Sequence, residues 1–265
     1  MTHQISDNGW IIPKKEHSTY STQRSQYYKL GNYDDKPLFN IIKAAEYFKL
    51  SIDQGQALSS LASLKDEAIK SSIGGIFDGP HIPFLLPSTL GSDDVGNILE
   101  TSYFPLLASS AELNGISFKY TLQGNDSNLS GSLAPIDSYR QLLHASSDSC
   151  IVGYYFPLAL EGYSPSSQLS AAAQLQQMSP VPVTLSGPLE ICSSLIVNNN
   201  LVFNKESYSQ ILCASAVQHR DSRLMLCFKT YGTGLEAWLM SKMLTPTMEQ
   251  VSEQWSGGLT LYCQL

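Results

Sequence analysis

The chain has 265 residues, of which 43% are hydrophobic and 15% charged, and its formal net charge is −7. This hydrophobic share is enough for a sizeable core, and it excludes a chain that is disordered throughout. Nucleic-acid binding draws its affinity from Lys and Arg on phosphates, and only Lys14 and Lys15 form an adjacent basic pair. We therefore expect no nucleic-acid partner.

The cysteines argue against a metal site and against a disulfide framework. Their number is odd and no CxxC pair occurs among Cys150, Cys192, Cys213, Cys227 and Cys263. The first thirty residues show no basic start followed by an apolar stretch, and no run of about 18 apolar residues occurs. We expect a cytoplasmic protein with no cofactor, no metal and no transmembrane segment.

The first 35 residues are polar and rich in Ser, Thr, Gln and Tyr, and Gly and Pro interrupt them. They predict an extended arm that lies on its own domain or on a neighbouring chain. Residues 36–265 predict one domain, because no internal repeat and no long low-complexity linker divides them.

Helical periodicity dominates residues 35–115. A first helix is expected to open at Asp35, with Pro37 in its first turn, and its apolar face extends to Phe48. Ser51 with Gln54 predicts the capping box of a second helix, and the first two helices predict a hairpin. A third helix follows Ser92 and should kink at Pro105. Residues 79–87, with three prolines, predict a rigid connection between helices.

The middle of the chain alternates between strand and helix patterns. Residues 150–160 are almost wholly apolar, as in a central strand buried on both faces. We expect strands at 116–123, 150–160 and 181–185, and helices at 137–144 and 166–178.

The C-terminal part predicts a meander of strands followed by two helices. The expected strands are 189–197, 201–203, 209–217 and 223–231. We expect helices from Gly234 through Leu244 and from Pro246 to Gly257, then a strand over 259–263. An alternative makes 205–217 a helix and the C-terminal half an α/β alternation.

These elements predict the α+β class, with an N-terminal helical hairpin and a kinked helix packed on a mixed, mostly C-terminal β-sheet. Few patterns in the chain carry recognisable chemistry. His219, Arg220 and Asp221 match the triplet of a kinase catalytic loop, but Leu226 stands where that loop needs Asn. We interpret the triplet as a polar turn between strands.

His81 is the leading candidate for a catalytic base, because it lies between Pro80 and Pro83 and rigid positioning favours such a group. Glu161 and Tyr231 are the other candidate acid and base groups, since both end a predicted strand beside a glycine. Gly loops at the ends of strands are frequent pocket sites. Tyr155, Glu236 and Trp238 are the candidate ligand-binding residues.

Three function hypotheses follow. The first is a non-catalytic protein that binds a protein partner or associates with itself through residues 1–35, because its exterior is polar and poor in charge. The second is a metal-free enzyme, or a binding protein, for a small neutral or aromatic molecule. The third is a membrane-active or toxin-like protein.

Overall fold

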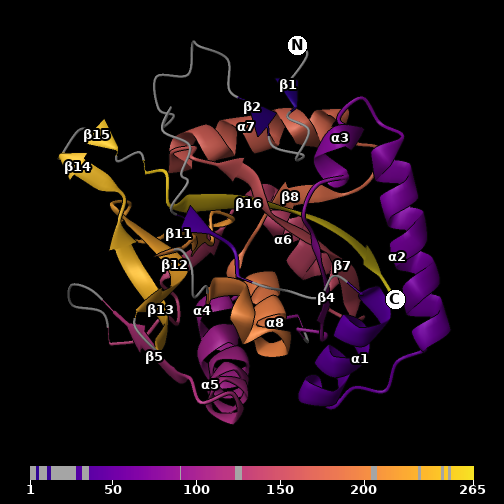
Figure 1. Cartoon of the computed structure of the whole chain (residues 1–265), viewed down its shortest axis with the longest axis horizontal. Coiled ribbons are helices and arrows are strands. Elements are labelled where there is room, and N and C mark those ends of the chain that lie inside the picture. Colours follow the sequence, from indigo (N-terminus) through magenta and orange to yellow (C-terminus); the bar gives the residue numbers. More distant parts are fainter. Residues whose placement is uncertain are drawn as a thin grey trace.

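The computed structural model describes residues 4–5, 11–12, 28–31, 36–89, 91–122, 127–203, 208–231, 234–245, 248–249 and 252–265. At residues 4, 231, 244–245 and 248–249 it describes the backbone alone. Helices surround a central mixed sheet, so the chain belongs to the α+β class (Figure 1). None of the described helices combines the length and the apolar composition that a bilayer crossing needs.

The main sheet contains eight strands of the described chain, seven of them in the order β4-β7-β16-β10-β12-β13-β5. The eighth, β8, pairs with β16. Two pairings are parallel, β10 with β16 and β13 with β5, and the others are antiparallel. The bounds are β4 (Ile82–Leu86), β5 (Ser117–Thr121), β7 (Ile151–Glu161), β8 (Val183–Leu185), β10 (Ile211–Cys213), β12 (Leu224–Tyr231), β13 (Gly234–Ser241) and β16 (Trp255–Gln264).

Short strands also form two-stranded pairs outside this sheet. The pairs are β1 (Gln4–Ile5) with β2 (Ile11–Ile12), β3 (Tyr28–Lys29) with β9 (Tyr208–Ser209), β6 (Leu133–Pro135) with β11 (Val217–His219), and β14 (Met243–Thr245) with β15 (Met248–Glu249).

The expected N-terminal helices are confirmed, with one different cap. Pro37 opens α1 (Pro37–Phe48), because a proline at the first helical position gives up no hydrogen bond. The N-cap of α2 (Gln54–Ile69) is Asp53, whose carboxylate accepts from the Gln56 amide at 3.0 Å. The predicted capping box at Ser51 is therefore wrong by two residues.

The third helix is interrupted where Pro105 predicts a kink. It consists of α4 (Val95–Ile98), a π-helical turn η1 (Leu99–Tyr103) and α5 (Phe104–Leu113). Pro105 has no N–H to donate to a carbonyl of the preceding turn. The helix therefore lacks one regular hydrogen bond there, and the preceding turn is the wider π turn η1. The short helix α3 (Gly74–Phe77) follows α2, and α6 (Asp137–Ala145) and α7 (Pro165–Met178) lie where the pattern predicts helices.

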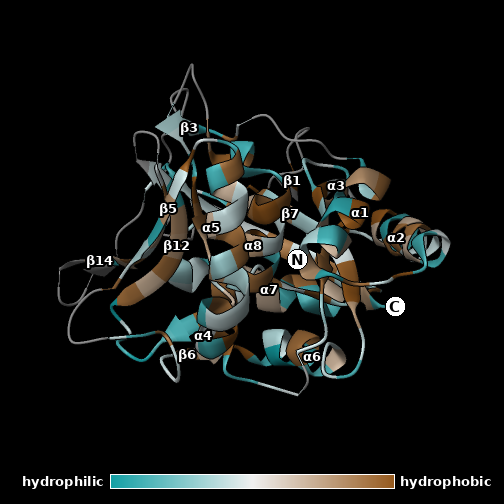
Figure 2. Cartoon of the chain, turned by 90° about the horizontal axis from the view of Figure 1, so that it is seen from below, coloured by the Kyte–Doolittle hydropathy of each residue, from teal (hydrophilic) through white to brown (hydrophobic). Residues whose placement is uncertain are grey.

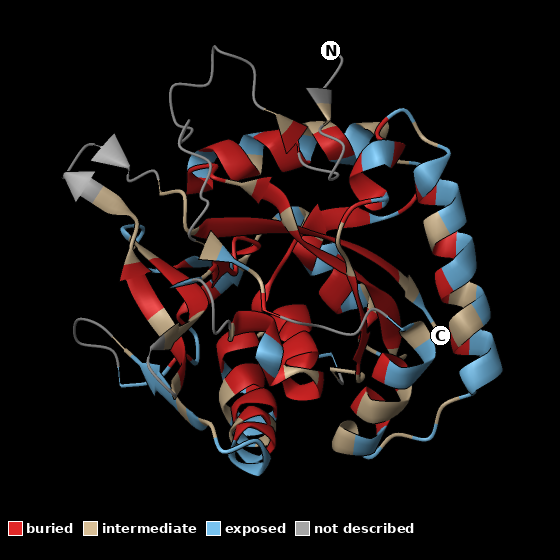
Figure 3. Ribbon diagram, viewed as in Figure 1, coloured by how far each residue is buried: buried red, intermediate tan, exposed pale blue. Residues whose placement is uncertain are grey.

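Helices cover both faces of the central strands. Phe77 of α3 packs its ring on Phe156 of β7, with centroids 5.4 Å apart. Tyr155 points to the opposite face, because successive side chains of a strand alternate. That face is covered by α8 (Pro188–Val197), whose Ser193 donates to the Leu85 carbonyl of β4. Figure 3 shows β7, β16 and α8 almost entirely buried.

The predicted strand over 189–197 is wrong, because these residues form α8. Every residue of α8 is buried, and most of the helix is apolar (Figure 2). Its polar residues, Glu190, Ser193 and Ser194, recur at helical spacing, a signal that the strand prediction overlooked. Pro188 at its first position and Glu190 in its first turn also favour a helix, but the apolar residues around them were interpreted as a strand. The predicted strand over 201–203 is also wrong, since the 3-10 turn η2 (Asn199–Val202) occupies it.

Both predicted C-terminal helices are wrong within the described residues. Gly234 through Ser241 form β13, which pairs with β12 from Tyr231↔Gly234 to Leu224↔Ser241. The segment expected to be a helix up to Gly257 includes β15 and the start of β16, while Pro246 lies outside the described residues. The predicted strand over 209–217 is confirmed only in part, because the segment divides into β9, β10 and β11, with a turn at 215–216 between the last two. No helix occurs over the described residues 208–217, so the helical alternative is wrong there.

The rigid connection predicted at 79–87 is in fact partly the strand β4. Pro83 is compatible with this strand because β4 is the edge of the main sheet. On its outer side no further strand of the described chain follows, so a residue facing that side needs no N–H to donate. Every residue of β4 is buried.

The described parts of the N-terminal arm contact the same chain. Ile11 is 3% exposed, and its carbonyl accepts from the Tyr163 hydroxyl at 3.4 Å. Gly31 donates to the Leu201 carbonyl at 2.7 Å, and a Cβ there would lie 1.8 Å from the Asn200 oxygen. Only glycine permits so close an approach of two backbones.

Candidate functional site

The structure does not bring the three candidate acid and base residues together. His81 precedes β4, whose Ile82 pairs with Tyr155, whereas Glu161 is the last residue of β7. Six residues of strand separate these two places, roughly 20 Å at about 3.3 Å per residue. Tyr231 ends β12, which β16 and β10 separate from β7, and its side chain lies outside the described residues.

Each of the first two has a structural role. The His81 Nδ1 donates to the Gly79 carbonyl at 2.7 Å, so its Nε2 is the acceptor for Lys65 Nζ at 2.9 Å. The ring also packs on Tyr154 and Phe156, with centroids 5.1 and 5.6 Å away. Neighbours therefore hold this neutral tautomer in place.

Glu161 accepts a short hydrogen bond from the Gln210 side-chain amide. The same amide nitrogen donates to the Tyr28 carbonyl at 3.2 Å. Gln210 thereby joins the end of β7 to the described end of the N-terminal arm.

Two of the candidate ligand-binding residues do meet. Glu236 and Trp238 share one face of β13, where Lys119 Nζ lies 2.8 Å and Lys229 Nζ 3.5 Å from the Glu236 carboxylate. Lys229 also lies 3.6 Å from the centroid of the Trp238 ring, a cation–π contact. The hydrogen bond from Lys119 is the largest cause that lowers the pKa of Glu236. Tyr155, fully buried in β7, does not belong to this group.

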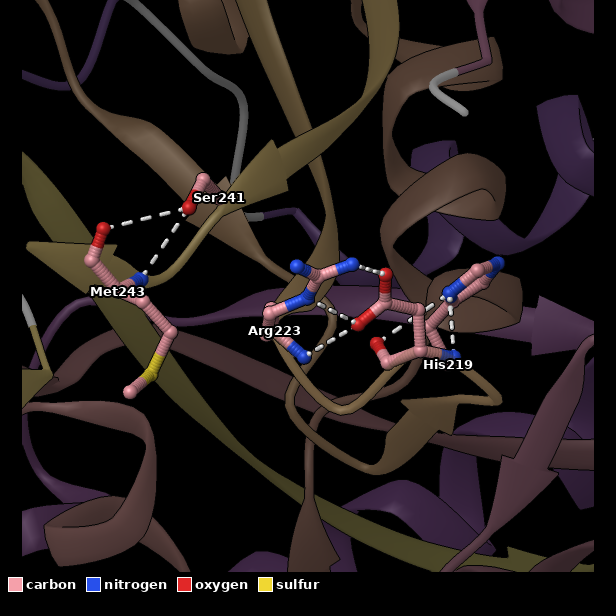
Figure 4. A network of polar contacts seen from close by, with 5 residues as sticks. His219, Arg223, Ser241 and Met243 are labelled. Atoms are coloured by element: carbon pink, nitrogen blue, oxygen red, sulfur yellow. Dashed lines mark hydrogen bonds and ion pairs between the residues drawn. The ribbon is translucent and has the colours of Figure 1, made fainter. Parts of the chain in front are cut away.

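The kinase-like triplet forms a polar turn, as the sequence predicts (Figure 4). The Asp221 amide donates to His219 Nδ1 at 3.1 Å. Arg223 donates to both Asp221 carboxylate oxygens, at 2.9 and 2.7 Å, which lowers the pKa of that carboxyl. These contacts close the link between β11 and β12.

Glu190 is a buried carboxyl that the sequence did not single out. It accepts from the Gly187 amide at 2.7 Å, from the Thr260 hydroxyl at 2.9 Å and from the Tyr139 hydroxyl at 2.9 Å. Burial raises its pKa to about 7, although these hydrogen bonds oppose the shift. The Tyr155 hydroxyl faces the same region and has no hydrogen-bond partner within the described part of the chain.

An open groove lies between α2 and the segment that joins α7 to β8. One part has a volume of about 540 Å³ and a second part about 460 Å³, and the two share Glu67 and Pro180. Helix α2 supplies one wall from Ser60 to Glu67, about 10 Å at about 1.5 Å per residue, and the turn after α2 extends it with Lys70, Ser71 and Ser72. The C-terminal end of β16 lies between the walls, beside α2 in Figure 1.

The lining of the groove is mainly apolar, with scattered polar side chains and almost no charge. Glu67 and Lys70 are its charged residues, and the Ser63 hydroxyl donates to Glu67 at 3.2 Å. Leu64 and Tyr262 supply apolar surface. The remaining lining residues are small, apolar or hydroxyl-bearing: Ser60, Ser71, Ser72, Ala145, Met178, Ser179, Pro180, Val181, Pro182, Cys263 and Gln264.

Sequence reasoning missed this groove because its walls come from segments more than one hundred residues apart. The outward face of α2 carries Ser60, Ser63 and Glu67, which the helical pattern identifies as ordinary solvent-facing residues. The pair of prolines at 180 and 182 predicts only a connection. Only the tertiary fold shows that the two surfaces face each other.

The fold and the groove define an α+β protein with an uncharged surface recess. No family model, no curated protein and no solved structure matches the chain. Within the described residues, no three His, Cys, Asp or Glu side chains are grouped to hold a metal ion. The case for function therefore depends on the groove itself.

Proposed function

We propose that this chain is a binding protein for a small uncharged molecule with an apolar ring, held in the groove along α2. The observation that carries the proposal is the groove: two adjoining parts, of about 540 and 460 Å³, lined by hydroxyl, proline and aliphatic side chains. Volumes of this order suit small ligands, which need apolar walls and a few hydrogen-bonding groups.

The charge of the groove supports an uncharged ligand. One carboxylate and one ammonium group line it, so the walls carry no net charge. A charged ligand would lose its hydration without meeting walls of net opposite charge, which is unfavourable. The serine hydroxyls, by contrast, both donate and accept hydrogen bonds.

The chemistry of the groove supports binding more than catalysis. Burial raises the pKa of the Cys263 thiol, so it remains protonated at neutral pH and is a poor nucleophile. No histidine lines either part of the groove. His81, the predicted base, has its two ring nitrogens engaged by Gly79 and Lys65.

The proposal is tested by ligand-observed NMR with uncharged aromatic fragments such as indole and phenol, with benzoate and benzylamine as charged counterparts. We expect a subset of the uncharged fragments to bind and the charged pair to bind at least tenfold more weakly. The variant Ser63→Trp should abolish binding, because its indole would fill the groove.

Ser59→Trp is the matched control, since Ser59 is exposed on the same helix but does not line the groove. Binding that survives Ser63→Trp, or that both variants abolish equally, would show that the ligand lies elsewhere. A complete lack of binding by the uncharged fragments would remove the proposal.

A second function, association with a protein partner or with another copy through residues 1–35, is favoured by one observation. Tyr208 is 71% exposed and stacks at 5.8 Å on Tyr28, at the described end of the arm. Exposed aromatic residues are frequent anchors of interfaces. Light scattering over a hundredfold concentration range should then show association that Tyr208→Ser weakens; a constant monomer mass would exclude self-association.

We also propose a cytoplasmic location. The support is the set of five cysteines, all of them free thiols. Free thiols are typical of a reducing compartment.

A further inference from the structure

Cys213 and Cys227 face each other across two neighbouring strands. They are register partners in the antiparallel pair of β10 and β12. The next residues along, Ala214 and Leu226, are joined by a hydrogen bond of 3.0 Å from the Ala214 amide to the Leu226 carbonyl. Hydrogen-bonded and non-hydrogen-bonded positions alternate along such a ladder, so Cys213 and Cys227 occupy a non-hydrogen-bonded position.

This position has the dimensions that a disulfide needs. The Cα atoms of a non-hydrogen-bonded pair are about 4.5 Å apart, and disulfides span Cα separations of about 4.4 to 6.8 Å. Both side chains point into one small cluster on the same face of the sheet, formed by Ile211, Cys213, Met225, Cys227, Met240 and Trp255. No rearrangement of the backbone is therefore required to join them.

The reduced pair is held by weak contacts. The Cys227 thiol donates to the Trp238 carbonyl at 3.3 Å, and the Cys213 thiol donates to the Ile211 carbonyl at 3.7 Å. Formation of the bond breaks only these two contacts, and thiols are weak donors, so little hydrogen bonding is lost.

We propose that Cys213 and Cys227 form a redox-sensitive pair that closes into a cross-strand disulfide in the presence of a low-molecular-weight disulfide of the glutathione type. One cysteine thiolate attacks the small disulfide and releases one small thiol, which leaves a mixed disulfide. The second cysteine thiolate attacks the protein sulfur of that mixed disulfide and releases the second small thiol. The two protein thiols are oxidised, the small disulfide is reduced, and the two protons end on the released thiols.

The position of the pair determines when it reacts. Both thiols are fully buried, and burial raises the pKa of Cys227 to about 12 and raises the pKa of Cys213 as well. Thiolates are therefore scarce in the closed fold, and the exchange proceeds through opening of the β10–β12 ladder. Once formed, the bond closes a loop of about 15 residues that contains β11 and the His219–Arg223 turn.

The test uses the full reduced chain incubated with oxidised glutathione, at neutral pH and at a temperature just below its thermal midpoint. Remaining thiols are then alkylated, and trypsin cleaves at Arg220, Arg223 and Lys229, which places the two cysteines on separate peptides. Mass spectrometry should find these two peptides linked, with Cys150, Cys192 and Cys263 alkylated. The thermal midpoint should rise by about 5 °C and fall again with dithiothreitol.

Cys263→Ser is the matched control and should keep the link, whereas Cys227→Ser should lose both the link and the rise. If Cys227→Ser fails to fold, the peptide map of the unaltered chain still tests whether the two cysteines are linked. Free thiols at both positions after the incubation, a stable glutathione adduct without closure, or a link between another pair would each overturn the proposal.

Discussion

At the scale of single residues, Glu190 is the most consequential side chain of the interior. It lies in the first turn of α8, where its carboxylate accepts from the Gly187 amide and satisfies a donor that the helix leaves free. Tyr139 and Thr260 bind the same carboxylate. The cost of burying the charge exceeds these gains, which is why the pKa of Glu190 is raised from 4.5 to about 7.

This shift predicts how stability depends on pH. A carboxyl that is harder to ionise in the folded state stabilises the fold while protonated, so its contribution is complete below pH 4.5 and is lost as pH rises through about 7. The variant Glu190→Gln removes this titration. Relative to that variant, the wild-type free energy of unfolding should fall by about 2 kcal/mol between pH 5 and pH 8, measured by urea denaturation. A difference that stays constant over this range would contradict the buried, protonated carboxyl.

Single residues also show what the sequence allows one to predict. Glu236 and Trp238 were both expected at a ligand site, but on a predicted helix, where residues two apart point in different directions. They share a face because this segment is the strand β13, so the sequence did not predict their contact. Glu190 was placed on a strand, so its capping role was invisible. Cys213 and Cys227 looked like isolated apolar residues, since register between strands is a property of the tertiary structure.

At the scale of elements, amphipathic helices were predicted well, and fully buried segments were predicted only in part. Helices α1, α2, α6 and α7 expose one side to solvent, and their period is therefore visible in the sequence. The buried strand β7 was predicted from its continuous apolar run, and the C-terminal part of β16 was also predicted as a strand. Helix α8 was predicted as a strand, because its apolar residues occupy most sides of the helix and leave only a narrow polar stripe.

Strand β7 depends on a glycine near its start. A Cβ on Gly153 would lie 2.1 Å from the Leu261 carbonyl oxygen of β16 and 2.6 Å from the Phe84 ring. The clash with the Leu261 carbonyl can be relieved only by a shift of the backbone, which costs more than the rotation of a side chain. Gly153→Ala should therefore lower the free energy of unfolding by about 3 kcal/mol in chemical denaturation. Gly55→Ala in the exposed first turn of α2 is the comparison, and it should change stability by less than about 1 kcal/mol. Equal effects of the two variants would show that the β7–β16 contact is looser than the structure has it.

At the scale of the whole molecule, the N-terminal arm and the domain are joined through a few buried contacts. The polar composition of residues 1–35 predicts an arm but not its position. The structure places Ile11 in the core and aligns β3 with β9, more than 170 residues later in the chain. Contacts so distant in sequence have no local signal, and for the same reason the groove along α2 was not foreseen.

The packing of the arm predicts that Ile11→Ala destabilises the entire domain. Deleting a buried isoleucine costs about 2 kcal/mol or more, whereas the half-buried neighbour Ile12 should lose less than about 1 kcal/mol in the same substitution. Thermal denaturation of the two variants measures the contrast. Indistinguishable midpoints would mean that the arm contributes nothing to the stability of the domain.

The central claim is that the groove along α2 receives a small uncharged ring-bearing molecule. Backbone NMR shift mapping with indole on the isotope-labelled chain tests it most directly. We expect shifts that saturate with concentration and that cluster at Ser63, Leu64, Val181 and Cys263, while the surface formed by Lys229, Glu236 and Trp238 stays unchanged. Shifts that cluster on that surface, or that spread over the molecule without saturating, would contradict the claim.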